Sequence, residues 1–269
     1  MVNSEPRSES SVRPDWRALI ELARGKRRIV AFTGAGISTD SGIPDYRGPQ
    51  GVWKTQSPPS IGDFFENHET RVRLWARSHR TYPELAARLP NGGHLALAEL
   101  ERIGVLGAII TQNIDGLHQK AGNSPEIVFE LHGAARRVRC TNCGAVFETS
   151  EIWNRLEAGE IVPACEVCGG ILRTGTVLFG EPLPKPALDA SIRAARWCDL
   201  MLVVGSSLVV NPAARLPVLA KERGAALAIL NRTATPLDDK ADVAVQGEAT
   251  PALLAVAGAL SAGAVGNES

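Results

Sequence analysis

The 269-residue chain lacks a net charge, because 29 Lys and Arg residues balance 29 Asp and Glu residues. A neutral balance does not steer a whole molecule toward nucleic acid or acidic membranes, so we expect neither as a direct partner. Long hydrophobic runs are also missing. The longest, 103–110 and 200–204, fall far short of the roughly 20 residues that a membrane helix needs.

Residues 1–14 are polar, contain Glu5 and Glu9, and lack the apolar core of a signal peptide, so we expect a disordered tail.

Cysteine is scarce. Four of the five cysteines form two C-x-x-C pairs, which suits metal binding in a reducing compartment better than a disulfide framework. The cytoplasm is therefore the expected location, and the oligomeric state is left open.

Apolar, β-branched runs alternate with segments of helical periodicity along the chain. The runs lie at 28–32, 105–110, 127–131, 200–204, 226–230 and 241–245. The helical segments lie at 16–23, 94–102, 187–197 and 213–223. This alternation predicts an α/β fold with a doubly wound, Rossmann-like parallel sheet.

Two regions break the alternation and are interpreted as insertions that form a smaller domain. Residues 48–90 are turn-rich at first and then helical through 71–80, and residues 136–173 contain the paired cysteines. The Rossmann-like domain is assigned the ranges 15–47, 91–135 and 174–262.

The paired cysteines predict one structural zinc ion in a zinc-ribbon insertion. Their positions are Cys140, Cys143, Cys165 and Cys168, and each pair is followed by glycine. Four thiolates make a closed tetrahedral site that leaves no position for water. A redox dithiol or four unrelated buried cysteines are the alternatives. Cys198 is interpreted as a small core residue.

A glycine-rich loop follows the first predicted strand. Gly34 and Gly36 would let backbone amides approach a pyrophosphate at the start of the next helix. Thr39 stands where a dehydrogenase fingerprint has its third glycine, and a plain tight turn is an alternative. The turn-rich segment 43–53 then brings together charges and aromatics, as loops that cover a cofactor often do.

Polar residues follow the second and third strands. Gln112, Asn113 and Asp115 could grip ribose hydroxyls and a carboxamide, although helix capping by Asn113 or Asp115 is the simpler alternative. His132 ends the next strand and is a candidate general base, although a lone histidine is more often structural.

Further along the chain, 205–207 and 231–233 place small or polar residues just past strands, where they could contact phosphate, ribose or adenine. Residues 177–181 are interpreted as a short exposed strand that could pair with an extended peptide. An ordinary edge strand is the alternative.

Taken in order, these motifs resemble those of the sirtuins, the NAD-dependent protein deacylases, over residues 15–260. The matching segments are Gly34 to Ser38, Pro44 to Arg47, Thr111 to Asp115, Leu131 to Gly133, both cysteine pairs, Phe179 to Glu181, Gly205 to Ser207 and Asn231.

The resemblance implies NAD as a co-substrate and one structural Zn²⁺. It implies His132, Asn113 and Asp115 as catalytic residues, with His132 the base. The implied NAD-binding residues are Gly34, Ala35, Gly36, Ile37, Ser38, Asp45, Arg47, Trp53, Gln112, Asn113, Ile114, Asp115, Gly205, Ser206, Ser207, Asn231 and Ala249. The implied substrate-binding residues are Val177, Leu178, Phe179, Gly180 and Glu181.

The implied activity removes acyl groups from lysines of proteins or peptides and yields nicotinamide and O-acyl-ADP-ribose. A protein mono-ADP-ribosyltransferase that uses the same site is the alternative. A non-catalytic zinc-ribbon module on a degenerate nucleotide fold and a dehydrogenase fit the motifs less well. The chain departs from the family pattern at Leu178, where many members have an aromatic residue, and at Leu74, where members that remove acidic acyl groups have tyrosine.

Overall fold

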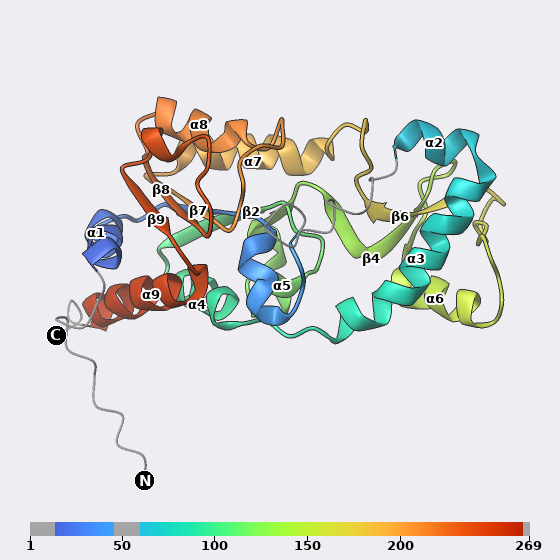
Figure 1. Ribbon diagram of the computed structural model, residues 1–269, viewed down its shortest axis with the longest axis horizontal. Coiled ribbons are helices and arrows are strands. Elements are labelled where there is room, and N and C mark those ends of the chain that lie inside the picture. The colour runs from blue at the N-terminus through green and yellow to red at the C-terminus, as the bar shows by residue number, and fades with distance from the viewer. Residues whose placement is uncertain (1–13, 46–59, 266–269) are drawn as a thin grey trace, which may run out of the picture.

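The computed structural model describes residues 14–45 and 60–265 (Figure 1). The predicted tail therefore lies outside the described residues except for Pro14, which begins the first helix. Within the described ranges, no helix combines the length and the apolar character that crossing a bilayer demands.

A six-stranded sheet in the order β3-β2-β1-β7-β8-β9 forms the centre of the larger lobe, and every neighbouring pair is parallel. All six strands were predicted from the sequence, and the predicted fold class is confirmed. Their bounds are β1 Ile29–Thr33, β2 Leu106–Thr111, β3 Val128–Glu130, β7 Leu200–Val204, β8 Ala226–Asn231 and β9 Val243–Gln246. Strands β1 and β7 are buried along their whole length, which explains why they are apolar at every position.

Helices cover both faces of this sheet (Figure 1). One face packs on α1 Pro14–Ala23, α4 Gly92–Arg102 and α9 Ala249–Val265. The other packs on α7 Lys185–Trp197 and α8 Arg215–Glu222. Helix α9 was not predicted, because its residues are nearly all small or apolar and show no helical periodicity.

Short helical turns connect several strands: η2 Ala35–Ser41, α5 Leu117–Lys120, η4 Pro125–Ile127 and η5 Asp238–Lys240. The glycine loop thus leads into a short 3₁₀ segment instead of the regular helix that the sequence predicted.

A second sheet forms the smaller lobe, with three antiparallel strands in the order β5-β4-β6. Its strands are β4 Gly133–Cys140, β5 Val146–Glu148 and β6 Leu172–Thr176. Three helices accompany it: α2 Ile61–Glu66, α3 His68–Ala87 and α6 Thr149–Glu157. The helix expected at 71–80 is the middle of α3. The sheet extends beyond both borders of the predicted 136–173 insertion, and the domain division itself stays a prediction.

Residues 177–181 do not form the predicted strand. Gly180 has a positive φ of 82°, and the Glu181 carboxylate accepts the backbone N–H of Leu178 at 3.0 Å, so the segment closes into a turn. A single bridge joins Phe179 to Ser60.

Trp75 holds the two parts of the smaller lobe together. It lies on α3, is 2% exposed, and packs in one cluster with Cys140, Cys165 and Leu172. A second link runs from the indole N–H of Trp153 to the backbone oxygen of His79 at 2.9 Å. The helical and cysteine-bearing parts therefore share one small core.

We predict that Trp75→Ala destabilises the smaller lobe by about 3–5 kcal/mol, the usual cost of removing a buried aromatic side chain. Chemical denaturation followed by circular dichroism measures this. Phe65→Ala is the control, because Phe65 lies on α2 with 47% of its surface exposed and should change stability little. Equal losses in the two variants would contradict the assigned core.

Candidate active site

The crevice lies where the strand order reverses, between β1 and β7. The backbone N–H of Gly34 donates to Val204 at 3.0 Å, and that of Gly36 donates to Gly205 at 2.9 Å. A Cβ on Gly36 would lie 2.6 Å from the Cα of Gly205, closer than any real side chain allows. Glycine is therefore required here for packing between the two loops, in addition to any approach of a ligand.

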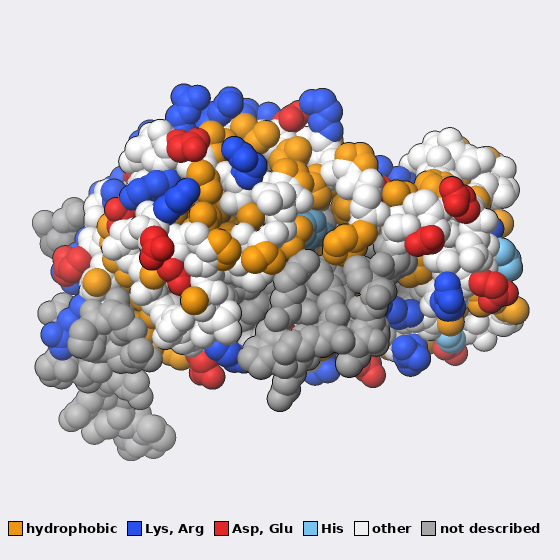
Figure 2. Space-filling view, turned by 45° about the horizontal axis from the view of Figure 1, so that its top comes forward, with side chains coloured by type: hydrophobic (Ala, Val, Ile, Leu, Met, Phe, Trp, Pro, Cys, Tyr) orange, Lys and Arg blue, Asp and Glu red, His pale blue; other side chains and the backbone are white. Residues whose placement is uncertain are grey.

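A cavity of about 690 Å³ opens beside these loops, large enough for a dinucleotide. Figure 2 shows one face of the molecule, on which apolar side chains gather along the middle, where the two lobes meet. The predicted residues that line the cavity are Gly34, Ala35, Gly36, Asp45, Gln112, Asn113, Ile114, His132, Val177, Leu178, Phe179, Gly180, Glu181, Gly205, Ser206, Ser207, Asn231 and Ala249.

Some predicted residues are placed elsewhere. Ile37 is buried in the main core and Ser38 is fully buried, and neither belongs to the cavity wall. Asp115 is not among the residues that line the cavity either. Arg47 and Trp53 lie outside the described residues. The roles of all these residues in binding stay predictions.

Asn113 is the centre of a buried hydrogen-bond network. Its side-chain nitrogen donates to the Gly34 oxygen and to Ser38 Oγ, each at 3.1 Å. Its backbone N–H donates to Thr111 Oγ1 at 3.0 Å. These bonds tie the turn after β2 to the glycine loop after β1.

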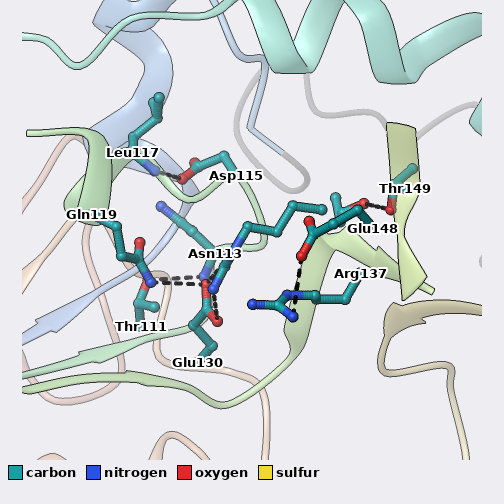
Figure 3. A network of polar contacts seen from close by, with 11 residues as sticks. Thr111, Asn113, Asp115, Leu117, Gln119, Glu130, Arg137, Glu148 and Thr149 are labelled. Carbon is teal, nitrogen blue, oxygen red and sulfur yellow. Dashed lines mark hydrogen bonds and ion pairs between the residues drawn. The ribbon is translucent and has the colours of Figure 1, made fainter. Parts of the chain in front are cut away.

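Asp115 continues this network. It accepts the Ser38 hydroxyl at 2.7 Å. It also accepts the backbone N–H of Leu117 at 2.9 Å (Figure 3). Burial raises the pKa of Asp115 above its ordinary value, and the hydrogen bonds from Leu117 and Ser38 oppose that rise. The bond to Leu117 reaches the first residue of α5, but the N-cap of this helix is Gly116, so Asp115 is not the capping residue that the sequence left open as an alternative.

His132 Nδ1 lies 2.9 Å from the backbone oxygen of Gln112. Because a carbonyl oxygen can only accept, Nδ1 carries the proton and the neutral ring has its lone pair on Nε2. Gly133 follows with a positive φ of 72°, and a Cβ there would collide with the Gly175 oxygen. This turn brings the chain from the main sheet into β4.

The end of β3 is clamped next to this histidine. Both carboxylate oxygens of Glu130 accept from Arg136, at 2.5 and 2.8 Å. Gln119 donates to the same carboxylate at 3.2 Å (Figure 3). The clamp joins β3, α5 and β4, and so restrains the backbone that presents His132.

Two further contacts assemble the cavity wall. Ser206 Oγ donates to Gln112 Oε1 at 2.7 Å, which joins the loop after β7 to the turn after β2. The backbone N–H of Val177 donates to the His132 oxygen at 2.9 Å. The predicted substrate segment therefore runs directly beside the predicted base.

Helix α3 supplies another wall of the cavity. Its lining residues include Leu74, where the sequence departs from family members that remove acidic acyl groups, and Arg77, Thr81 and Leu85. Arg232 and Glu248 also line the cavity and form an ion pair, with 3.9 Å between Arg232 Nη2 and Glu248 Oε1. The helical periodicity of 71–80 predicts α3, but no local pattern shows which face meets the cavity.

The four paired cysteines meet in space. Their sulfur atoms all lie within 4.8 Å of one another, with 3.5 Å between Cys140 and Cys168 and 3.7 Å between Cys143 and Cys165. A tetrahedral zinc ion with Zn–S bonds of about 2.3 Å places sulfurs about 3.8 Å apart, whereas a disulfide needs about 2.05 Å. The set therefore fits one structural zinc ion and no disulfide.

The knuckle turns agree with this geometry. Gly144 and Gly169, which follow the two pairs, have positive φ angles of 75° and 70°. Cys198 lies apart in the main core, where burial raises the pKa of its thiol to about 11. It is the small core residue that the sequence predicted.

Comparison with known proteins decides the family. The Sir2 family model matches residues 34–212, which include the glycine loop, His132 and all four zinc ligands. This chain belongs to the Sir2 family. The NAD-dependent protein deacetylase of Sulfolobus acidocaldarius is 43% identical over 86% of this chain and 89% of its own length.

Other members agree. The NAD-dependent protein deacetylase 2 of Streptomyces coelicolor is 45% identical over 86% of this chain and 98% of its own. A solved Sir2 structure with a deacetylated p53 peptide and 3′-O-acetyl ADP ribose is 37% identical, with a TM-score of 0.82 over 92% of this chain and 98% of that one. The predicted sirtuin resemblance is thus confirmed.

We predict that the purified Sir2 protein holds one zinc ion per chain and that Cys143→Ser or Cys165→Ser removes it. Losing one thiolate opens a closed site and should unfold the smaller lobe. Elemental analysis and circular dichroism measure both effects. Cys198→Ser is the matched control and should keep its zinc. A cysteine-pair variant that lost metal but kept its fold would contradict the structural role.

Proposed function

We propose that this protein removes acyl groups from lysines of proteins or peptides with NAD as co-substrate, yielding nicotinamide and O-acyl-ADP-ribose. The arrangement around His132 carries the proposal, because the glycine loop, the Asn113 turn and the 177–181 segment line one cavity with it. The names of the relatives favour deacylation over the alternative, protein mono-ADP-ribosylation.

Each predicted binding residue has a role in this proposal, including Ile37, Ser38 and Asp115, which do not line the cavity themselves. The loop from Gly34 to Ser38 holds the pyrophosphate, while 205–207, Asn231 and Ala249 hold the adenosine end. Gln112, Asn113, Ile114 and Asp115 hold the nicotinamide ribose and carboxamide. Asp45, with Arg47 and Trp53 outside the described residues, belongs to the covering loop. Residues 177–181 hold the acyl-lysine peptide.

NAD supplies an activated ribose carbon from which nicotinamide departs. The protein must then take a proton from a ribose hydroxyl, which is a poor acid in water. His132 suits this task, because its Nδ1–H is fixed on the Gln112 oxygen and its Nε2 has the lone pair. In this proposal Asn113 and Asp115 assist catalysis by orienting the nicotinamide ribose and the carboxamide.

The cytoplasm is proposed as the location. Four thiolates that bind zinc are kept reduced there, whereas an oxidising compartment would favour disulfides.

We predict that mass spectrometry of an acetyl-lysine peptide incubated with NAD and the protein detects acyl-ADP-ribose. His132→Tyr should lower kcat by about 10²- to 10⁴-fold, the usual contribution of a general base. His68→Tyr is the control, because His68 is exposed at the start of α3.

The outcome separates the candidate functions. Absence of acyl-ADP-ribose, or an unchanged rate in His132→Tyr, would refute deacylation. Transfer of labelled ADP-ribose to protein without an acyl substrate would favour the alternative. A panel of acyl-lysine peptides, from acetyl to long-chain and acidic groups, then defines the acyl preference.

A further inference from the structure

A chain of hydrogen bonds runs from the core to Asn113. His118, on α5, is 1% exposed, and its Nε2 lies 2.9 Å from Thr33 Oγ1. Thr33 Oγ1 donates to Thr111 Oγ1 at 2.8 Å, and Thr111 Oγ1 accepts the backbone N–H of Asn113 at 3.0 Å. Neither Thr33 nor His118 lines the cavity.

The direction of this chain follows from counting protons. A hydroxyl has one hydrogen, and Thr33 gives its hydrogen to Thr111, so the Thr33 oxygen accepts from His118. The proton of neutral His118 is therefore on Nε2, and Nδ1 is an acceptor. Within the described residues, this buried Nδ1 has no partner.

The His94 ring packs beside that of His118. It is fully buried in the first turn of α4, where its Nδ1 accepts the backbone N–H of Asn91 at 3.4 Å. The proton is thus on Nε2, which is buried and lacks a partner among the described residues. The His94 and His118 rings lie 5.1 Å apart between centroids. Nε2 of His94 and Nδ1 of His118 make no hydrogen bond to each other, so the two rings meet as a ring contact.

Both rings are uncharged near neutral pH. Burial lowers the pKa of His94 to about 4. Burial, with the nearby His94 as a second cause, lowers the pKa of His118 to about 3. A neutral His118 ring has a single N–H, which is the donor that Thr33 Oγ1 accepts.

We propose that His118, Thr33 and Thr111 form a neutral hydrogen-bond relay, with the His94 ring packed beside it, that positions the Asn113 turn for NAD. His118 is a positioning residue, since it acts through Thr33 and Thr111. The relay connects α5 to the carboxyl ends of β1 and β2. Its link to catalysis rests on the proposed function, in which Asn113 holds the nicotinamide end.

Two matched pairs of variants test the relay. Thr33→Val and His118→Leu remove its polar atoms, whereas Thr33→Ser and His118→Gln retain a hydroxyl and an N–H donor. We expect Thr33→Val and His118→Leu to raise the KM for NAD by about tenfold, because each breaks one buried hydrogen bond. Thr33→Ser and His118→Gln keep that hydrogen bond and should raise the KM for NAD by less than about twofold. The KM for the acyl peptide should not change.

A double variant adds a second criterion. Thr33→Val combined with His118→Leu should be no worse than either alone, because each already interrupts the same chain. Effects that multiply, or an unchanged KM for NAD beside a lowered melting temperature, would reduce these residues to a structural role and overturn the proposal.

A third measurement is independent of turnover. Nitrogen-15 NMR of histidine-labelled wild-type protein at neutral pH should show both buried rings in the neutral Nε2–H tautomer, with His94 perturbed by His118→Leu. An Nδ1–H tautomer at His118 would overturn the relay, because Nε2 would then have no proton to donate to Thr33. If the wild-type protein forms no acyl-ADP-ribose, the proposed function fails, and calorimetric NAD affinity of the same variants then decides the relay separately.

Discussion

The contact between the glycine loop and Gly205 is the constraint on which the crevice depends. Strands β1 and β7 are parallel neighbours, but the next strand after β1 is β2 on one side and the next after β7 is β8 on the other. The connections that leave the two strands therefore diverge, and a crevice opens beyond their carboxyl ends. The two loops can meet there only because neither carries a side chain at the point of contact. This closeness sets the floor of the cavity against which the turn from Gln112 to Asp115 is fixed.

One of the connections between the second lobe and this floor is very short. His132 ends the main-sheet path and Gly133 begins β4, so the candidate base lies at the joint between the lobes. The zinc-binding cysteines lie far along that lobe and share its core with Trp75. A zinc ion held by these cysteines would stabilise the small core that packs on α3, and α3 lines the cavity.

Much of this arrangement could be predicted from the sequence, for identifiable reasons. The six strands are apolar because both faces of the sheet are covered, and the cysteine spacing follows from the geometry of a metal knuckle. The turn at 177–181 could not be predicted, because Glu181 caps it only while Arg173 holds its carboxylate at 2.6 Å. The contact between the His94 and His118 rings joins two separate helices, so no local sequence pattern predicts it.

The pairing of β1 with β7 also has a consequence for how the molecule is made. Ile29 lies opposite Leu200 in the sheet, so almost the whole smaller lobe and half the larger one separate these neighbours in the chain. Contacts of such long sequence separation form slowly, because a large loop must close first. During synthesis, the edge of β1 that pairs with β7 therefore stays unpaired until residues 200–204 have left the ribosome. The crevice between these strands is thus among the last features to form.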